Sequence, residues 1–107
     1  MSGSGGGGFT TYDPPVIACE SLIIETAISS PKAAVVNRLT VGDVLDVGLE
    51  NTPGSMVVAL YSNGQLAGGI THPSTNRLRE CIQGGTRYRA TVTSVSAGQV
   101  RVRIKPL

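Results

Sequence analysis

Aromatic side chains are scarce in this sequence of 107 residues. Its aromatic residues are Phe9, Tyr12, Tyr61 and Tyr88, and tryptophan is absent. Proteins that bind single-stranded nucleic acid without sequence preference stack the bases on exposed aromatic rings. The shortage argues against that mode of binding. Any contact with nucleic acid would depend mostly on phosphate groups and on arginine stacking.

Long apolar segments are absent as well. No apolar run approaches the roughly 20 residues that a membrane-spanning helix needs, so we expect no membrane partner. Residues 1–8 are rich in serine and glycine, and they lack the basic start and the apolar stretch of a secretory signal. Both observations favour a protein that works in water.

Cysteine is rare too, with only Cys19 and Cys81 present. Secreted disulfide scaffolds of this size usually carry about four or more cysteines, so we expect a protein of the reducing cytoplasm. The two side chains could still meet across the core. In a reducing compartment, however, buried free thiols are the expected state.

Groups that support catalysis or metal binding are few. His72 is the only histidine, and a cysteine–histidine pair would need an activated thiolate within hydrogen-bond reach of it. We expect Cys81 to face the core and His72 to cap a helix instead. The sequence shows no carboxylate pair, no phosphate-binding loop and no Cys-x-x-Cys spacing. We therefore expect no enzyme, no metal site and no cofactor.

The start of the chain is unsuited to a core. Residues 1–18 combine a glycine run with the extended stretch Asp13-Pro14-Pro15, and this composition predicts a flexible leader. The remaining residues, 19–107, are enough for one hydrophobic core. The sequence therefore predicts a single domain after the leader.

Alternating apolar and polar residues predict strands along most of this domain. The nearly continuous apolar run Met56–Tyr61 predicts a central strand that is covered on both faces. Asn63-Gly64 predicts a tight hairpin turn, and Gly68-Gly69 predicts a bulge or a close backbone approach. The expected strands are residues 19–28, 43–50, 56–61, 65–71, 87–95 and 99–105.

Residues 72–83 have a helical period. Leu78, Cys81 and Ile82 recur at i, i+3 and i+4, and Gly84-Gly85 follows as a stop, which predicts one amphipathic helix. Ser30-Pro31 predicts an N-cap and a first-turn proline of a second, short helix that runs through residue 36.

The order of these elements predicts the fold. A helix between the third and fourth strands of a five-stranded barrel is the plan of the OB fold. We therefore expect a mainly β, OB-like barrel of five to six strands, with one amphipathic helix and one short helix. An SH3-like barrel is the alternative.

The charge is distributed unevenly along the chain. Residues 1–76 carry two basic and six acidic residues, and residues 77–107 carry seven basic residues and one acidic residue. Such an imbalance bears on binding partners and not on the fold. On the last two strands, cations alternate with inward apolar residues and would form one stripe. The candidate nucleic-acid-binding residues are Arg77, Arg79, Arg87, Arg89, Arg101, Arg103 and Lys105.

The stripe allows two interpretations. Like charges on neighbouring strands destabilise a sheet, and a phosphate backbone, which arginine binds in a bidentate manner, would offset this repulsion. Alternatively, the stripe is a solvated face that Glu20, Glu25 or Asp46 partly neutralises. Our first hypothesis is a non-enzymatic module that binds DNA or RNA. The second is a module that docks an acidic protein, offers a strand edge or associates with itself.

Two resemblances accompany these patterns. Residues 41–47, residues 57–68, the helix before Gly84-Gly85 and residues 88–92 together resemble a HIRAN domain. This resemblance implies an OB-like fold and DNA binding, notably to single-stranded 3′ ends, and we transfer no individual ligand residue from it. Cys19-Glu20 and residues 81–88 are similar to segments of small bacterial proteins with a Gly/Ser-rich N-terminus. That similarity implies a bacterial setting and no activity.

Overall fold

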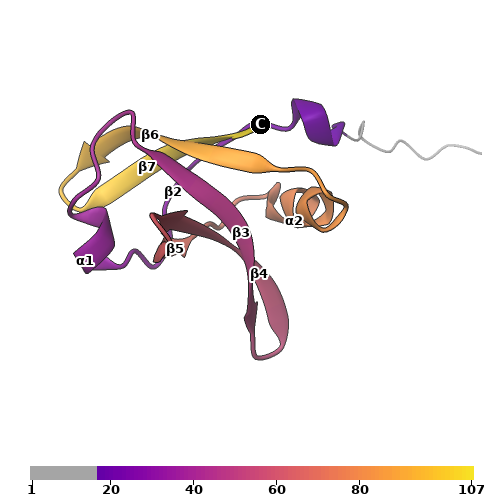
Figure 1. The fold of residues 1–107 in the computed structure, drawn as a ribbon, viewed down its shortest axis with the longest axis horizontal. Helices are drawn as coiled ribbons and strands as arrows, with labels where there is room; N and C mark the ends of the chain where they lie inside the picture. Colours follow the sequence, from indigo (N-terminus) through magenta and orange to yellow (C-terminus); the bar gives the residue numbers. More distant parts are fainter. Residues whose placement is uncertain (1–16) are drawn as a thin grey trace, which may run out of the picture.

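A computed structural model describes residues 17–107. The predicted leader, residues 1–18, therefore lies outside the described residues except for Ile17 and Ala18. The described chain forms one antiparallel sheet in the order β2-β7-β6-β3-β4-β5 (Figure 1), which confirms the mainly β, barrel-like prediction. The strands are β2 (Ile24–Ala27), β3 (Val44–Thr52), β4 (Ser55–Ser62), β5 (Gln65–Gly69), β6 (Tyr88–Ser96) and β7 (Gln99–Pro106).

The two outer strands of this sheet meet through a backbone bridge. Ser29 follows β2, and its N–H donates to the Gly69 carbonyl at 2.7 Å while the Gly69 N–H donates back at 2.9 Å. Gly68 lies directly against this junction with a φ of +153°, and a Cβ there would lie 2.5 Å from Cγ2 of Ile28. A register shift also interrupts the β4–β5 pairing next to Leu60. The close approach and the bulge predicted at Gly68-Gly69 are thus both present.

Inward side chains from all six strands fill the barrel. The predicted alternation is confirmed on β7, where Val100, Val102 and Ile104 are buried and the residues between them are exposed. On β4, three consecutive residues, Val58 to Leu60, are buried, as expected for a strand covered on both faces. The core therefore occupies the positions that the sequence pattern indicates.

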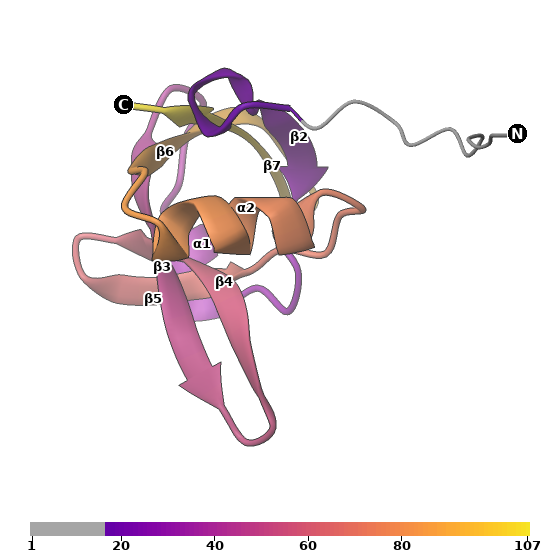
Figure 2. The same cartoon turned by 90° about the vertical axis from the view of Figure 1, so that its right-hand side faces the viewer.

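Two helices lie at opposite ends of the barrel, α1 (Ala33–Val36) and α2 (Thr75–Gln83) (Figures 1 and 2). The assignment of Ser30 as the N-cap of the short helix was wrong, because Lys32 precedes α1 and Ser30 has a φ of +48°. The backbone bonds of Ser29 and Lys32 to β5 hold residues 29–32 in extended and turn conformations. The helix can therefore begin only at Ala33.

The amphipathic helix also begins later than expected, after Ser74. The Nδ1 atom of His72 accepts a hydrogen bond from the Ser74 N–H at 3.0 Å, and the His72 carbonyl accepts one from the Thr75 N–H. His72 thus stabilises the turn that leads into α2. The expectation that His72 caps the helix was wrong, because Ser74 is the N-cap residue and no side chain caps α2.

The expectation of free thiols was wrong. Cys19 and Cys81 form a disulfide with a Cα–Cα distance of 5.5 Å. The start of the first predicted strand is instead a short 3₁₀ helix, η1 (Cys19–Ser21), and Cys81 on the core-facing side of α2 meets it. Disulfides persist mainly in oxidising compartments, so the argument for a reducing cytoplasm loses its basis.

Candidate nucleic-acid interface

The outward side of the β6–β7 hairpin carries the densest group of cations among the predicted residues. Arg101, Arg103 and Lys105 are exposed on β7, where alternate side chains on one face recur about every 6.6 Å. Arg89 on β6 lies directly opposite Lys105 in the strand register. We call these four residues, Arg89, Arg101, Arg103 and Lys105, the basic face.

Two acidic residues of neighbouring strands lie beside the basic face. Glu25 on β2 accepts hydrogen bonds from Nη2 and Nε of Arg103 at 2.8 and 3.0 Å. Asp46 on β3 is the register partner of Arg89. The Arg103 and Glu25 side chains are 50% and 58% exposed, and such exposed pairs contribute at most about 1 kcal/mol. A phosphate group could therefore compete with Glu25 for Arg103.

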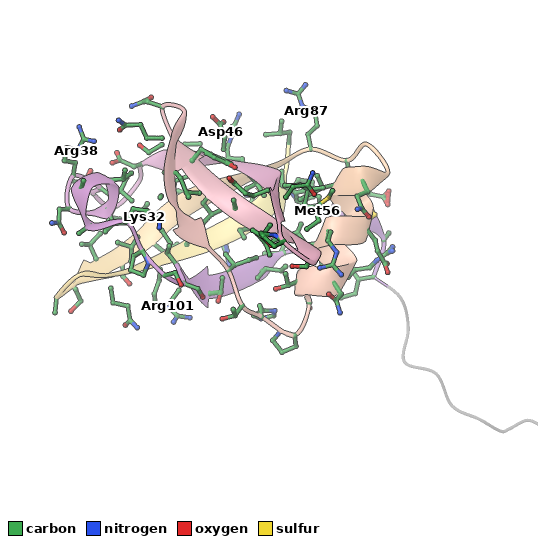
Figure 3. All side chains as sticks on the ribbon, turned by 90° about the horizontal axis from the view of Figure 1, so that it is seen from below. Lys32, Arg38, Asp46, Met56, Arg87 and Arg101 are labelled. Atoms are coloured by element: carbon green, nitrogen blue, oxygen red, sulfur yellow. A yellow bond between two sulfur atoms is a disulfide. The ribbon has the colours of Figure 1, made fainter. Side chains whose placement is uncertain are left out.

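Arg87 and Arg101 lie at opposite ends of the predicted stripe. Arg87 projects on the same side of the ribbon as Asp46, whereas Arg101 projects on the opposite side (Figure 3). Arg87 and Arg89 both line a cavity of about 590 Å³, which opens where β6 separates from β3. We call it the β3–β6 cavity. The predicted stripe therefore runs from this cavity at one end to Arg101 at the other.

The two helical arginines are engaged elsewhere. Nε and Nη2 of Arg77 donate to the Ile17 carbonyl at 3.1 and 3.0 Å. Arg79 donates to the side chain of Asn76 at 2.7 Å and to the Met56 carbonyl at 3.4 Å. These contacts hold both arginines on α2 and its neighbours, so neither of them joins the outward side of the hairpin.

Neither of the two tyrosines within residues 17–107 lies on the basic face. Tyr88 is 5% exposed and faces the core, as its position in the alternation predicts, and its hydroxyl donates to the Cys19 carbonyl at 2.6 Å. Burial raises the pKa of Tyr88 above 10.0. The hydroxyl of Tyr61 donates to the Glu50 carboxylate, and this hydrogen bond is the main cause of a raised pKa at Tyr61. Contacts through the basic face would thus involve phosphate and not stacked bases.

A second cavity, of about 400 Å³, which the sequence did not predict, lies over the seam where the barrel closes. Its lining is mostly apolar, and its polar lining residues come from three separate segments. Only the pair Gly68-Gly69 pointed to this place. The polar lining residues are Ser29, Ser30, Lys32, Glu50, Thr52 and Thr71.

The two residues considered as a catalytic pair, Cys81 and His72, are both engaged in structural contacts. Cys81 is oxidised in the disulfide, and His72 is engaged in the turn before α2. Residues 17–107 contain no group of three or more side chains that could hold a metal ion. They also contain no helix long and apolar enough to cross a membrane.

Comparison with known proteins adds no relative: no family model matches the chain, and no curated protein or solved structure shows significant similarity to it. The basic face and the two cavities are the surface features of residues 17–107 on which a functional proposal can rest.

Proposed function

We propose that the domain is a non-enzymatic module that binds nucleic-acid phosphates through the basic face. The observation that carries this proposal is the direct opposition of Arg89 and Lys105, with Arg101 and Arg103 on the same side of β7. Like charges in such positions destabilise a sheet, and a bound polyanion offsets the repulsion. Arginine also matches the geometry of a phosphate.

The expected mode of binding is contact with the phosphate backbone, without base stacking. Four cations that each neutralise one phosphate of a duplex predict a slope of log affinity against log salt of about −3.6. Such contacts position a protein on nucleic acid but do not read its sequence. We expect similar affinities for duplexes of different sequence.

The proposal is tested by titrating fluorescently labelled duplex and single-stranded DNA and RNA with the full chain at two salt concentrations. The double variant R101Q/K105Q should bind more weakly and flatten the salt slope by about 2. The single variant R101Q is matched by R38Q, which also removes one exposed arginine. Arg38 bonds to Ala34 and Gln65 and lies outside the basic face, so its loss should change the slope little. Absence of binding at low salt would overturn the proposal.

A further inference from the structure

One strand edge near the β3–β6 cavity has no strand partner within residues 17–107. The β3–β4 hairpin projects beyond the barrel (Figures 1 and 2). β3 pairs with β4 from Asp46 to Thr52, but its pairing with β6 covers only Val44, Leu45 and Asp46. Beyond Asp46, the second edge of β3 therefore has no neighbouring strand in the described chain.

The backbone pattern identifies which groups face this edge. The Asp43 carbonyl accepts a hydrogen bond from the Val92 N–H on β6, so Asp43 faces that side. Alternate residues of an antiparallel strand direct their N–H and C=O groups to the same side. Val47, Leu49 and Asn51 therefore direct theirs toward the open edge.

The β4 edge of the same hairpin differs from the β3 edge because α2 contacts it. Met56 on β4 is the register partner of Asn51, and its carbonyl points away from β3, where it accepts a hydrogen bond from Arg79 of α2. The β4 edge is thus partly covered. Two features that often protect exposed edges are missing from residues 47–52, which contain neither lysine nor proline, and these residues pair with β4 in regular register. Glu50 is the one charged residue among them.

Two arginines lie at the Val47 end of the open β3 edge. The β3–β6 cavity is lined by Asp46 and Val47 from β3, by Arg87 just before β6 and by Arg89 within it. Leu107 also lines it, and the Leu107 N–H donates to the Arg87 carbonyl at 2.9 Å. The remaining lining residues are Ile82, Gly85, Thr86 and Tyr88. A strand added antiparallel to β3 would run from Asn51 toward Val47 and would arrive in this cavity with its carboxyl end. There β6 occupies the neighbouring position, with Arg89 opposite Asp46, so an added strand must end at Val47.

We propose that this edge binds the C-terminal segment of a partner protein as an added antiparallel strand of about five residues. Val47, Leu49 and Asn51 supply the backbone hydrogen bonds, and Arg87 and Arg89 bind the terminal carboxylate. β6 blocks a chain that continues past Val47, which selects a terminus over an internal segment. Strand addition and capture of a terminal carboxylate are both established modes of peptide recognition. This site is separate from phosphate binding at Arg101, Arg103 and Lys105, and Arg89 is shared by both.

The test uses the probe peptide Thr-Val-Thr-Val-Thr-Val, acetylated at its N-terminus, with either a free C-terminal carboxylate or a C-terminal amide. The full chain is titrated with each peptide and followed by ¹⁵N NMR. We expect saturable shifts of the Val47, Leu49 and Asn51 amides, and at least tenfold tighter binding of the carboxylate form. The double variant R87Q/R89Q should remove this difference between the two peptides without disturbing the rest of the spectrum.

Further results separate this inference from nucleic-acid binding and from binding at the other cavity. The R101Q variant weakens nucleic-acid binding if the basic face acts as proposed, but it should leave the peptide affinity unchanged. Equal affinity for the carboxylate and amide peptides would overturn the inference, as would shifts centred on Lys32 and Glu50 of the other cavity. The absence of saturable shifts at millimolar peptide would overturn it as well. None of these outcomes depends on whether nucleic acid binds.

Discussion

At the scale of single residues, Gly68 shows how one position closes the barrel. Its φ of +153° is rare for any residue with a side chain. A methyl group there would lie 2.7 Å from the Ser29 carbonyl oxygen, which belongs to the backbone bridge between the two ends of the sheet. The glycine is therefore required both by its conformation and by the space around it.

We expect Gly68→Ala to lower the free energy of unfolding by about 2–4 kcal/mol, since overpacking and an unsuitable φ act together. Gly64→Ala is the matched control, because Gly64 has a φ of +82° and a methyl group there would meet nothing within 4 Å. Gly64→Ala should lower the free energy of unfolding by only about 1 kcal/mol. Urea unfolding measures both values, and equal losses would contradict the role assigned to Gly68.

Tyr61 gives a prediction on pH. Its hydrogen bond to Glu50 raises its pKa above 10.0 in the folded protein, so the neutral phenol is favoured by folding. Its contribution to stability is therefore present below pH 10.0 and is lost as the pH rises through the folded-state pKa. Tyr88, whose pKa burial raises, acts in the same direction.

Glu50→Gln removes the carboxylate and should lower the pKa of Tyr61. An absorbance titration of tyrosinate, compared between the wild-type protein and the variant, measures the shift. The free energy of unfolding, measured with urea, should be lower above pH 10.0 than at neutral pH. This decrease should be smaller in the Glu50→Gln variant than in the wild-type protein. An unchanged titration curve would show that Glu50 does not control Tyr61.

At the scale of elements, the pairing of β2 with β7 decides how many cations of the basic face are available. Glu25 lies opposite Arg103 in the register and forms an ion pair with it. Both side chains are largely exposed, so the pair adds little to stability. Its larger effect is that Glu25 neutralises the charge of Arg103 and so lowers the net positive charge of the basic face.

We expect Glu25→Gln to release Arg103 and to raise the affinity for duplex DNA several-fold, with a salt slope near the wild-type value of about −3.6, because Arg103 is one of the four cations in both proteins. Salt-dependent titration measures both, and the unfolding free energy should change by less than about 1 kcal/mol. Glu80→Gln is a suitable control, because Glu80 forms its ion pair with Arg77 on α2. A weaker affinity in the Glu25 variant would contradict the proposed use of Arg103.

Elements were predicted well where the period of the side chains was clear. The strands from Val44 onward and the core side of α2 follow directly from alternation and helical spacing. The start of α1 was not predictable in this way, because backbone bonds from Ser29 and Lys32 to β5 determine it. Such bonds join residues that are far apart in the sequence and leave no local pattern.

At the scale of the whole molecule, the disulfide ties the beginning of the domain to α2. It joins residues separated by 62 positions, and closing a loop of that length restricts the unfolded chain strongly. The loop-closure model gives about 4 kcal/mol of stabilisation for this length. The bond therefore contributes a large share of the roughly 5–15 kcal/mol that is typical of a domain.

We expect reduction of the disulfide to lower the unfolding free energy by about 2–5 kcal/mol. Urea unfolding with and without a thiol reductant measures the loss, and mass spectrometry after alkylation confirms the state of the cysteines. The variant C19A/C81A is the control, because the reductant should not affect it. If reductant left the wild-type midpoint unchanged while alkylation showed two free thiols, the stabilising role would be refuted.

The sequence by itself determined the mainly β class, the buried faces of the strands and the cationic residues of the last hairpin. These properties follow from side-chain alternation and composition, which are local. Only the tertiary structure decided the Cys19–Cys81 bond, the engagement of Arg77 and Arg79 away from the hairpin, and the β3 edge that ends at Arg87 and Arg89. Each of these features depends on where one strand or helix contacts another, or on where the pairing of two strands ends. The packing of segments that are distant in the sequence sets these positions.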